Sequence, residues 1–120
     1  MIKSSSASSN NRMIAEQIAA RGISDPRVLA AMRSVDRSLF VPPDVVEEAY
    51  ADHPLPISHS QTISQPYIVA YMTWLLQVRP DDRVLEIGTG TGYQTAILAR
   101  LAREVWSLEI IAELAHTARP

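Results

Sequence analysis

The segment RVLEIGTGTGYQTAILARLAREVWSLEI, residues 83–110, is the feature that most constrains the fold. It opens with a short β-rich apolar run from Arg83 to Ile87, passes through three closely spaced glycines, and then shows helical spacing of apolar residues from Tyr93 to Ala102. A second β-rich run extends from Glu104 to Glu109. A strand, a glycine-rich turn, a helix and a strand in this order predict a right-handed βαβ unit, and therefore an α/β fold with a parallel sheet.

The loop from Glu86 to Gly92 has the pattern of a nucleoside-binding turn. Glycines at alternate positions let the backbone leave the strand in conformations closed to other residues, and let a ligand lie against it. Glu109 ends the next strand about 20 residues after Gly88, where a carboxylate can accept both hydroxyls of a ribose. Glu86 repels a pyrophosphate but attracts an ammonium or sulfonium group, which favours S-adenosylmethionine over NAD. A tight turn that binds no ligand is the alternative.

The residues before this unit predict a mostly helical region. Apolar residues from Arg12 are spaced as in a helix that Gly22 ends, and Asp25-Pro26 is a capping residue followed by a first helical residue. Four prolines between positions 38 and 57 leave room only for a short helix around Asp44 to Tyr50. An apolar stripe predicts another helix from Gln65 to about Val78.

Composition excludes several classes of function. The net charge is −2 and the eleven Lys and Arg residues are scattered, so we expect no nucleic-acid partner. There is no cysteine, and the three histidines lack metal-ligand spacing, so no metal site is expected. No apolar stretch approaches the ~18 residues that span a bilayer, and the N-terminus lacks a secretory signal. We therefore expect a soluble cytoplasmic protein with no membrane partner.

Several stretches together resemble the protein-L-isoaspartate (D-aspartate) O-methyltransferase family: RGISDPRVLAAM, SLFVPP, AYADHPLPI, QTISQPYIVAYMTWLL, and RVLEIGTGTGYQTAILARL followed by VWSLEI. QTISQP is specific to this family, whereas many methyltransferases share the glycine loop. The resemblance implies a Rossmann-like class I methyltransferase fold preceded by a helical region. It also implies transfer of the methyl group of S-adenosylmethionine to the free carboxylate of isoaspartyl and D-aspartyl residues in damaged proteins, which is a repair activity.

The resemblance assigns roles to individual residues. It implies that Ser64 is the active-site residue. The cofactor-binding set that it implies is Gln61, Thr62, Ile63, Ser64, Glu86, Gly88, Thr89, Gly90, Gly92 and Glu109. A carboxylate is already ionised at neutral pH, so the reaction needs no general base, and a serine would orient the carboxylate rather than attack as a nucleophile. The simpler reading, in which Ser64 caps the following helix, is compatible with this role.

Two features depart from the family pattern. Ser58-His59-Ser60 stands where the family has Gly-x-Gly, which costs on the order of 1 kcal/mol per residue if the backbone has positive φ there. The sequence also ends at Pro120, whereas family members continue through further strands. We therefore expect a truncated fold with an open sheet edge that is poorly active alone or self-associates through that edge. A non-catalytic module that assembles through this edge, and a nicotinamide-binding half-domain, remain alternatives.

These observations divide the chain into three expected parts. Residues 1–11 are rich in Ser and Asn and are expected to form a disordered tail. Residues 12–78 are expected to form the helical region, with the substrate and cofactor loop at 58–65. Residues 79–120 are expected to form the first βαβ unit of an S-adenosylmethionine-binding domain.

Overall fold

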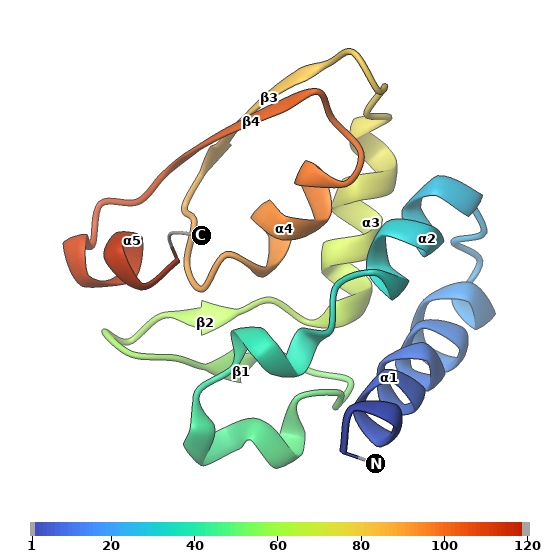
Figure 1. Ribbon diagram of the computed structural model, residues 1–120, viewed down its shortest axis with the longest axis horizontal. Helices are drawn as coiled ribbons and strands as arrows, with labels where there is room; N and C mark the ends of the chain where they lie inside the picture. The colour runs from blue at the N-terminus through green and yellow to red at the C-terminus, as the bar shows by residue number, and fades with distance from the viewer. Residues whose placement is uncertain (1, 119–120) are drawn as a thin grey trace.

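The computed structural model describes residues 2–118, so Met1, Arg119 and Pro120 lie outside the described residues (Figure 1). Helices come first along the chain, a small hairpin follows, and a parallel strand pair flanked by further helices completes it. The elements are α1 (Ile2–Met13), α2 (Pro26–Arg33), β1 (Leu55–Pro56), β2 (Thr62–Ile63), α3 (Pro66–Leu76), β3 (Arg83–Ile87), α4 (Tyr93–Ala99), β4 (Glu104–Leu108) and α5 (Ala112–Ala118), with short helical turns η1 to η4 between them.

The predicted βαβ unit is present, which confirms the α/β fold class. β3 and β4 pair in parallel, from Arg83 opposite Glu104 to Ile87 opposite Leu108. The predicted strand bounds are correct to within one residue. α4 is shorter than predicted, because the chain turns after Ala99, although Leu101 in this turn is still buried.

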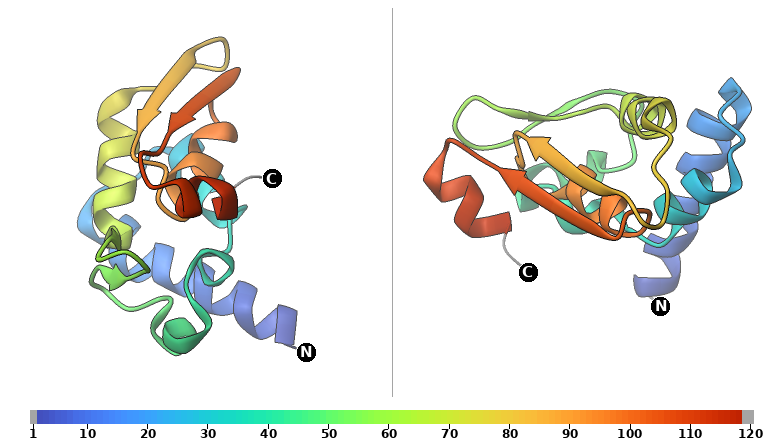
Figure 2. Two further views of the ribbon diagram at one scale, coloured as in Figure 1. Left: turned by 90° about the vertical axis from the view of Figure 1, so that its left-hand side faces the viewer. Right: turned by 90° about the horizontal axis from the view of Figure 1, so that it is seen from above.

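The two faces of this sheet differ in exposure: the apolar run from Arg83 to Ile87 predicted a buried strand, but β3 is only half-buried on the side toward α4 and exposed on the other. Figure 2 shows that α4 lies on one side of the β3–β4 pair. The other side presents four large apolar side chains that are 56–72% exposed: Leu85, Ile87, Trp106 and Leu108. The strand register places Leu85 opposite Trp106 and Ile87 opposite Leu108. These four residues form a continuous apolar patch, called here the open sheet face.

The β1–β2 hairpin leads into α3, and α3 packs against α2 (Figure 1). β1 and β2 are antiparallel, with Leu55 opposite Ile63. The turn between them contains His59 and Ser60, both at positive φ (61° and 56°). Ser60 therefore replaces a family glycine at a position where glycine is the least strained residue, whereas Ser58 is not at positive φ.

The first helical segment ends at Gly22 and α2 begins after Asp25, as the sequence predicted, although α1 begins at Ile2 and not at Arg12. α1 continues through a π-helical turn, η1 (Ile14–Ile18), and a 3-10 turn, η2 (Ala19–Arg21), to Gly22, whose φ of 101° ends the helical path. Asp25 caps α2, because its carboxylate accepts hydrogen bonds from the backbone N–H groups of Arg27 (2.9 Å) and Val28. The proline-rich segment forms two short 3-10 turns, η3 (Arg37–Phe40) and η4 (Pro43–Glu48).

The prediction of a disordered tail over residues 1–11 is corrected by the structure. α1 begins at Ile2 and packs against the rest of the chain. Asn10 is buried, and its amide nitrogen donates to the carbonyls of Met32 and Val35 at 3.3 Å each. The hydroxyl of Ser6 bonds to the side chains of Asp36 and Tyr50. Composition suggested disorder because polar residues bury little apolar surface, but here these residues satisfy polar groups that the following helix and loop leave unpaired.

One apolar core joins the helical region to the sheet. It includes Ile18, Met32, Leu55, Ile97 and Leu98, which come from four different elements or turns. Within residues 2–118, no helix has the length and apolar character needed to cross a membrane.

Candidate functional site

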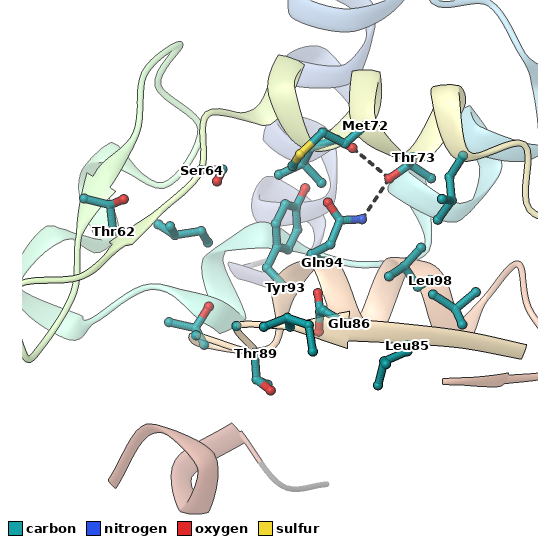
Figure 3. A pocket seen from close by; sticks show the side chains of 18 residues that line it. Thr62, Ser64, Met72, Thr73, Leu85, Glu86, Thr89, Tyr93, Gln94 and Leu98 are labelled. Atoms are coloured by element: carbon teal, nitrogen blue, oxygen red, sulfur yellow. Dashed lines mark hydrogen bonds between the residues drawn. The ribbon is translucent and has the colours of Figure 1, made fainter. Parts of the chain in front are cut away.

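A cavity of about 400 Å³ lies between α3, the end of β2 and the glycine loop. Figure 3 shows Ser64 and Thr62 on one side and Glu86 and Thr89 across the space from them. The cavity therefore brings together segments that are more than twenty positions apart in the sequence.

Seven of the ten predicted site residues line this cavity, and three do not. Those that line it are Thr62, Ile63, Ser64, Glu86, Gly88, Thr89 and Gly90. Gly92 lines a second, larger cavity of about 900 Å³ between α4, α5 and the η3–η4 segment. Gln61 is exposed in the hairpin turn, where its N–H donates to the Ser58 carbonyl at 3.3 Å. Glu109 lies behind the glycine loop, as described below.

The glycine loop has the backbone conformation that requires glycine. Gly88, Gly90 and Gly92 have φ values of 93°, 57° and 93°. A Cβ atom built on Gly88 or Gly90 would meet no other atom within 4 Å, so open space lies beside this part of the backbone. At Gly92 the same atom would lie 3.5 Å from the Ala118 Cβ. The first two glycines therefore leave room for a ligand, whereas the third allows close packing.

Glu86 is held in place by hydroxyl groups from two other elements. Ser107 of β4, its partner in the strand register, donates to Oε1 at 2.6 Å, and Thr95 of α4 donates to the same oxygen. Because both bonds use Oε1, the second carboxylate oxygen is left for a donor in the cavity. Sequence reasoning missed Ser107 and Thr95, although the parallel register alone places Ser107 beside Glu86.

Glu109 is bonded to the loop itself. Its Oε1 accepts from the Gly90 N–H at 2.8 Å and its Oε2 from the Ile111 N–H at 3.1 Å. The hydrogen bond from Gly90, followed by that from Ile111, lowers the pKa of Glu109, so the group is ionised at neutral pH. In this arrangement Glu109 fixes the shape of the glycine loop, and the ribose-binding role remains a prediction.

Ser64 does not cap α3, which corrects one reading of the sequence. The N-cap residue is Gln65, which makes no capping hydrogen bond through its side chain, and Pro66 is the first helical residue. Ser64 is exposed on the cavity wall, and no described residue hydrogen-bonds to its hydroxyl. The hydroxyl is therefore available to a ligand.

A charged network fixes the chain next to Ser64. The guanidinium of Arg21 forms an ion pair with Asp52, and the Gln65 amide donates to the same carboxylate at 2.8 Å. The hydrogen bond from Arg21, followed by that from Gln65, lowers the pKa of Asp52. The start of α3 is thereby tied to η2 and to the loop before β1.

Polar residues of α3 and α4 that the sequence did not single out also line the cavity. Thr73, Tyr93 and Gln94 lie along the wall between Ser64 and Leu98 (Figure 3). The Gln94 amide nitrogen donates to the Thr73 hydroxyl at 2.8 Å. Their helical positions look like ordinary packing positions in the sequence, so no sequence signal marked them.

The site contains no group of metal ligands. Within residues 2–118, no three His, Asp or Glu side chains are placed to hold a common ion.

The comparisons with known proteins agree in assigning the family. Residues 8–120 match the family model of protein-L-isoaspartate(D-aspartate) O-methyltransferase. The protein-L-isoaspartate O-methyltransferase of Methanoregula boonei is 63% identical over 108 residues, which cover 90% of this chain and 50% of that protein. The enzyme of the same name from Opitutus terrae is 60% identical over 106 residues, covering 88% and 46%. The chain thus spans about half the length of these curated relatives.

Solved structures give the same result. The crystal structure of a Plasmodium falciparum protein-L-isoaspartate O-methyltransferase, in complex with S-adenosyl-L-homocysteine, superposes with a TM-score of 0.77 at 30% identity, covering 91% of this chain and 52% of that one. A second protein-L-isoaspartate O-methyltransferase superposes with a TM-score of 0.73 at 28% identity, covering 90% and 36%. The chain belongs to the protein-L-isoaspartate (D-aspartate) O-methyltransferase family.

Proposed function

We propose that this chain forms the cofactor-binding and carboxylate-binding part of an S-adenosylmethionine-dependent protein-L-isoaspartate O-methyltransferase. The observation that carries the proposal is the cavity in which the unbonded hydroxyl of Ser64 lies across from the glycine loop and Glu86. Family membership and the S-adenosyl-L-homocysteine bound to the related Plasmodium falciparum protein support it.

The residues of the loop fit the chemistry of the cofactor. Glu86 supplies a carboxylate oxygen toward the cavity, which suits the ammonium group of a methionine moiety. Gly88 and Gly90 leave open space beside the backbone, as a closely approaching ligand requires. When bound, S-adenosylmethionine supplies an activated methyl group, which passes to a carboxylate oxygen while the sulfur retains the electrons of the broken bond.

The chain's own task in this reaction is placement. An isoaspartyl carboxylate is ionised at neutral pH, so no side chain has to remove a proton. The Ser64 hydroxyl donates to one carboxylate oxygen and leaves the other free to attack in line. Alignment of this kind can lower a barrier by ~7–11 kcal/mol. The Arg21–Asp52–Gln65 network keeps the serine in position.

Calorimetry tests the proposal. We expect the chain to bind S-adenosylhomocysteine more tightly than NAD, and the cofactor-saturated chain to bind an isoaspartyl peptide more tightly than the matching aspartyl peptide. Ser64→Ala should weaken binding of the isoaspartyl peptide about tenfold, the loss expected for a hydrogen bond to a charged group. Ser24→Ala, at an exposed serine outside the cavity, should not. Tighter binding of NAD, or equal binding of the two peptides, would contradict the proposal.

The open sheet face favours a second candidate function, that of a module that assembles with another copy of itself. Four apolar side chains on one face of a two-stranded sheet form a larger apolar surface than isolated exposed residues do. The sequence predicts that copies of the chain associate through the sheet edge, and the open sheet face provides a second surface for this association. We propose concentration-dependent self-association, which sedimentation would measure.

A further inference from the structure

Two polar atoms in the wall of the cavity have no hydrogen-bond partner among the described residues: Oη of Tyr93 and Oε1 of Gln94. Tyr93 is only 2% exposed, and both residues begin α4. Figure 3 shows both side chains directed toward α3, where Met72 and Thr73 form the opposite wall. Leaving such groups unpaired costs about 1–3 kcal/mol each, so their conformation calls for an explanation.

The orientation of the Gln94 amide is fixed by its neighbours. The hydroxyl of Thr73 donates to the Val69 carbonyl at 2.7 Å, which uses its only proton. The same hydroxyl can then only accept, so Gln94 must present its NH₂ group to Thr73, at 2.8 Å. This leaves the Gln94 Oε1 as an acceptor that needs a donor.

Tyr93 supplies a hydrogen-bond donor, whereas Gln94 supplies an acceptor. Burial raises the pKa of Tyr93 to about 12, against the opposing effect of the Arg37 charge, so the hydroxyl keeps its proton at neutral pH. The Arg37 guanidinium is fully buried, lies 5.0 Å from the centre of the Tyr93 ring, and has two nitrogens without a partner. A positive charge over the ring favours an anionic acceptor for the hydroxyl proton.

We propose that Tyr93 and Gln94 form a subsite for a carbon atom that carries both a carboxylate and a nitrogen bearing at least one hydrogen. The Tyr93 hydroxyl donates to the carboxylate, and the Gln94 oxygen accepts from the nitrogen. This inference rests on the proposed function, in which two ligands carry this group: the methionine end of the cofactor, and the isoaspartyl residue, whose free carboxylate and amide nitrogen share one carbon. An ordinary aspartyl side chain has one more bond between them. Met72 is a flexible side chain of the same wall, so it can move aside when a ligand enters.

The test uses Tyr93→Phe and Gln94→Leu, with Tyr71→Phe as the control, because Tyr71 is exposed on α3 and outside the cavity. Since the Tyr93 hydroxyl has no hydrogen-bond partner within residues 2–118, Tyr93→Phe should melt at the same temperature as the unaltered chain or higher. The binding probes are S-adenosylhomocysteine and 5′-methylthioadenosine, which lacks the amino-acid end. With the chain saturated by S-adenosylhomocysteine, an isoaspartyl peptide is compared with the same peptide carrying an amide.

A roughly tenfold weaker binding of S-adenosylhomocysteine by both variants, with 5′-methylthioadenosine unchanged, supports the subsite and assigns it to the cofactor. A similar loss for the isoaspartyl peptide alone supports it and assigns it to the substrate. If all affinities stay within twofold, or if Tyr93→Phe lowers the melting temperature, the subsite is overturned while the proposed function stands. If the unaltered chain binds none of the probes, the proposed function itself falls.

Discussion

At the scale of single residues, the charge of Glu86 can be separated from its hydrogen bonds. Glu86→Gln keeps an oxygen that accepts from Ser107 and Thr95, but removes the negative charge beside the cavity. We expect affinity for S-adenosylmethionine to fall about tenfold, as for the loss of a charged hydrogen bond, with little change in melting temperature. Calorimetry at low and moderate salt measures this. Glu104→Gln, which removes a surface partner of Arg83, is the control, and an unchanged affinity would show that Glu86 serves only the fold.

At the same scale, the glycine loop and the Thr62–Ser64 segment were predicted as parts of the candidate site from the sequence. The residues that contact them in the structure, such as Ser107, were not predicted. Gly88 and Gly90 are recognisable because positive φ restricts the residue type. Tyr93 and Gln94 were missed because their role depends on unpaired atoms, and the absence of a partner is visible only when the three-dimensional neighbours are known. Ser64 was interpreted as a possible cap because Ser-Gln-Pro is common at helix starts, whereas the structure starts the helix one residue later.

At the scale of elements, the hairpin between β1 and β2 stores strain at Ser60. Ser60→Gly should relieve the strain that a serine has at a φ of 56°. Ser58 has no such strain, so Ser58→Gly only adds conformational freedom to the unfolded chain. We expect the free energy of unfolding to be higher for Ser60→Gly than for Ser58→Gly by about 1 kcal/mol. Urea unfolding measures it, and equal values for the two variants would contradict the strain.

α1 depends on a polar contact that acid should weaken. Burial raises the pKa of Asp36, but hydrogen bonds from Ser6, Tyr50 and Ser38 outweigh it and lower the pKa below its usual 3.8. Because the folded pKa is the lower one, this stabilisation is present above pH about 3.8 and is lost as the pH falls through the folded value.

Asp36→Asn should therefore destabilise the chain at neutral pH and lose that effect as the pH falls below 3.8 through the folded pKa, where the native carboxyl also becomes protonated. Hydrogen exchange of α1 follows the same contact locally, and Asp44→Asn is a control at a surface carboxylate. A difference between Asp36→Asn and the unaltered chain that does not depend on pH would contradict this account.

At the scale of the whole molecule, the order of elements was predictable and the exposure of the sheet was not. Strand bounds and helix starts follow from local spacing, so β3, β4 and the start of α4 were found close to their true positions. The burial of Leu85 or Trp106 depends on what lies on the far side of the sheet, which local spacing cannot specify.

The open sheet face gives the final prediction. A patch of four large apolar side chains should drive self-association of the chain at micromolar concentrations, because covering it removes apolar surface from water. The double variant Trp106→Lys with Leu108→Lys places two like charges next to each other on the open sheet face of β4. It should be a monomer in sedimentation equilibrium. Leu39→Lys, at a residue 79% exposed outside the sheet, should still associate. A monomeric unaltered chain, or association that survives the paired lysines, would show that this face does not join copies of the chain.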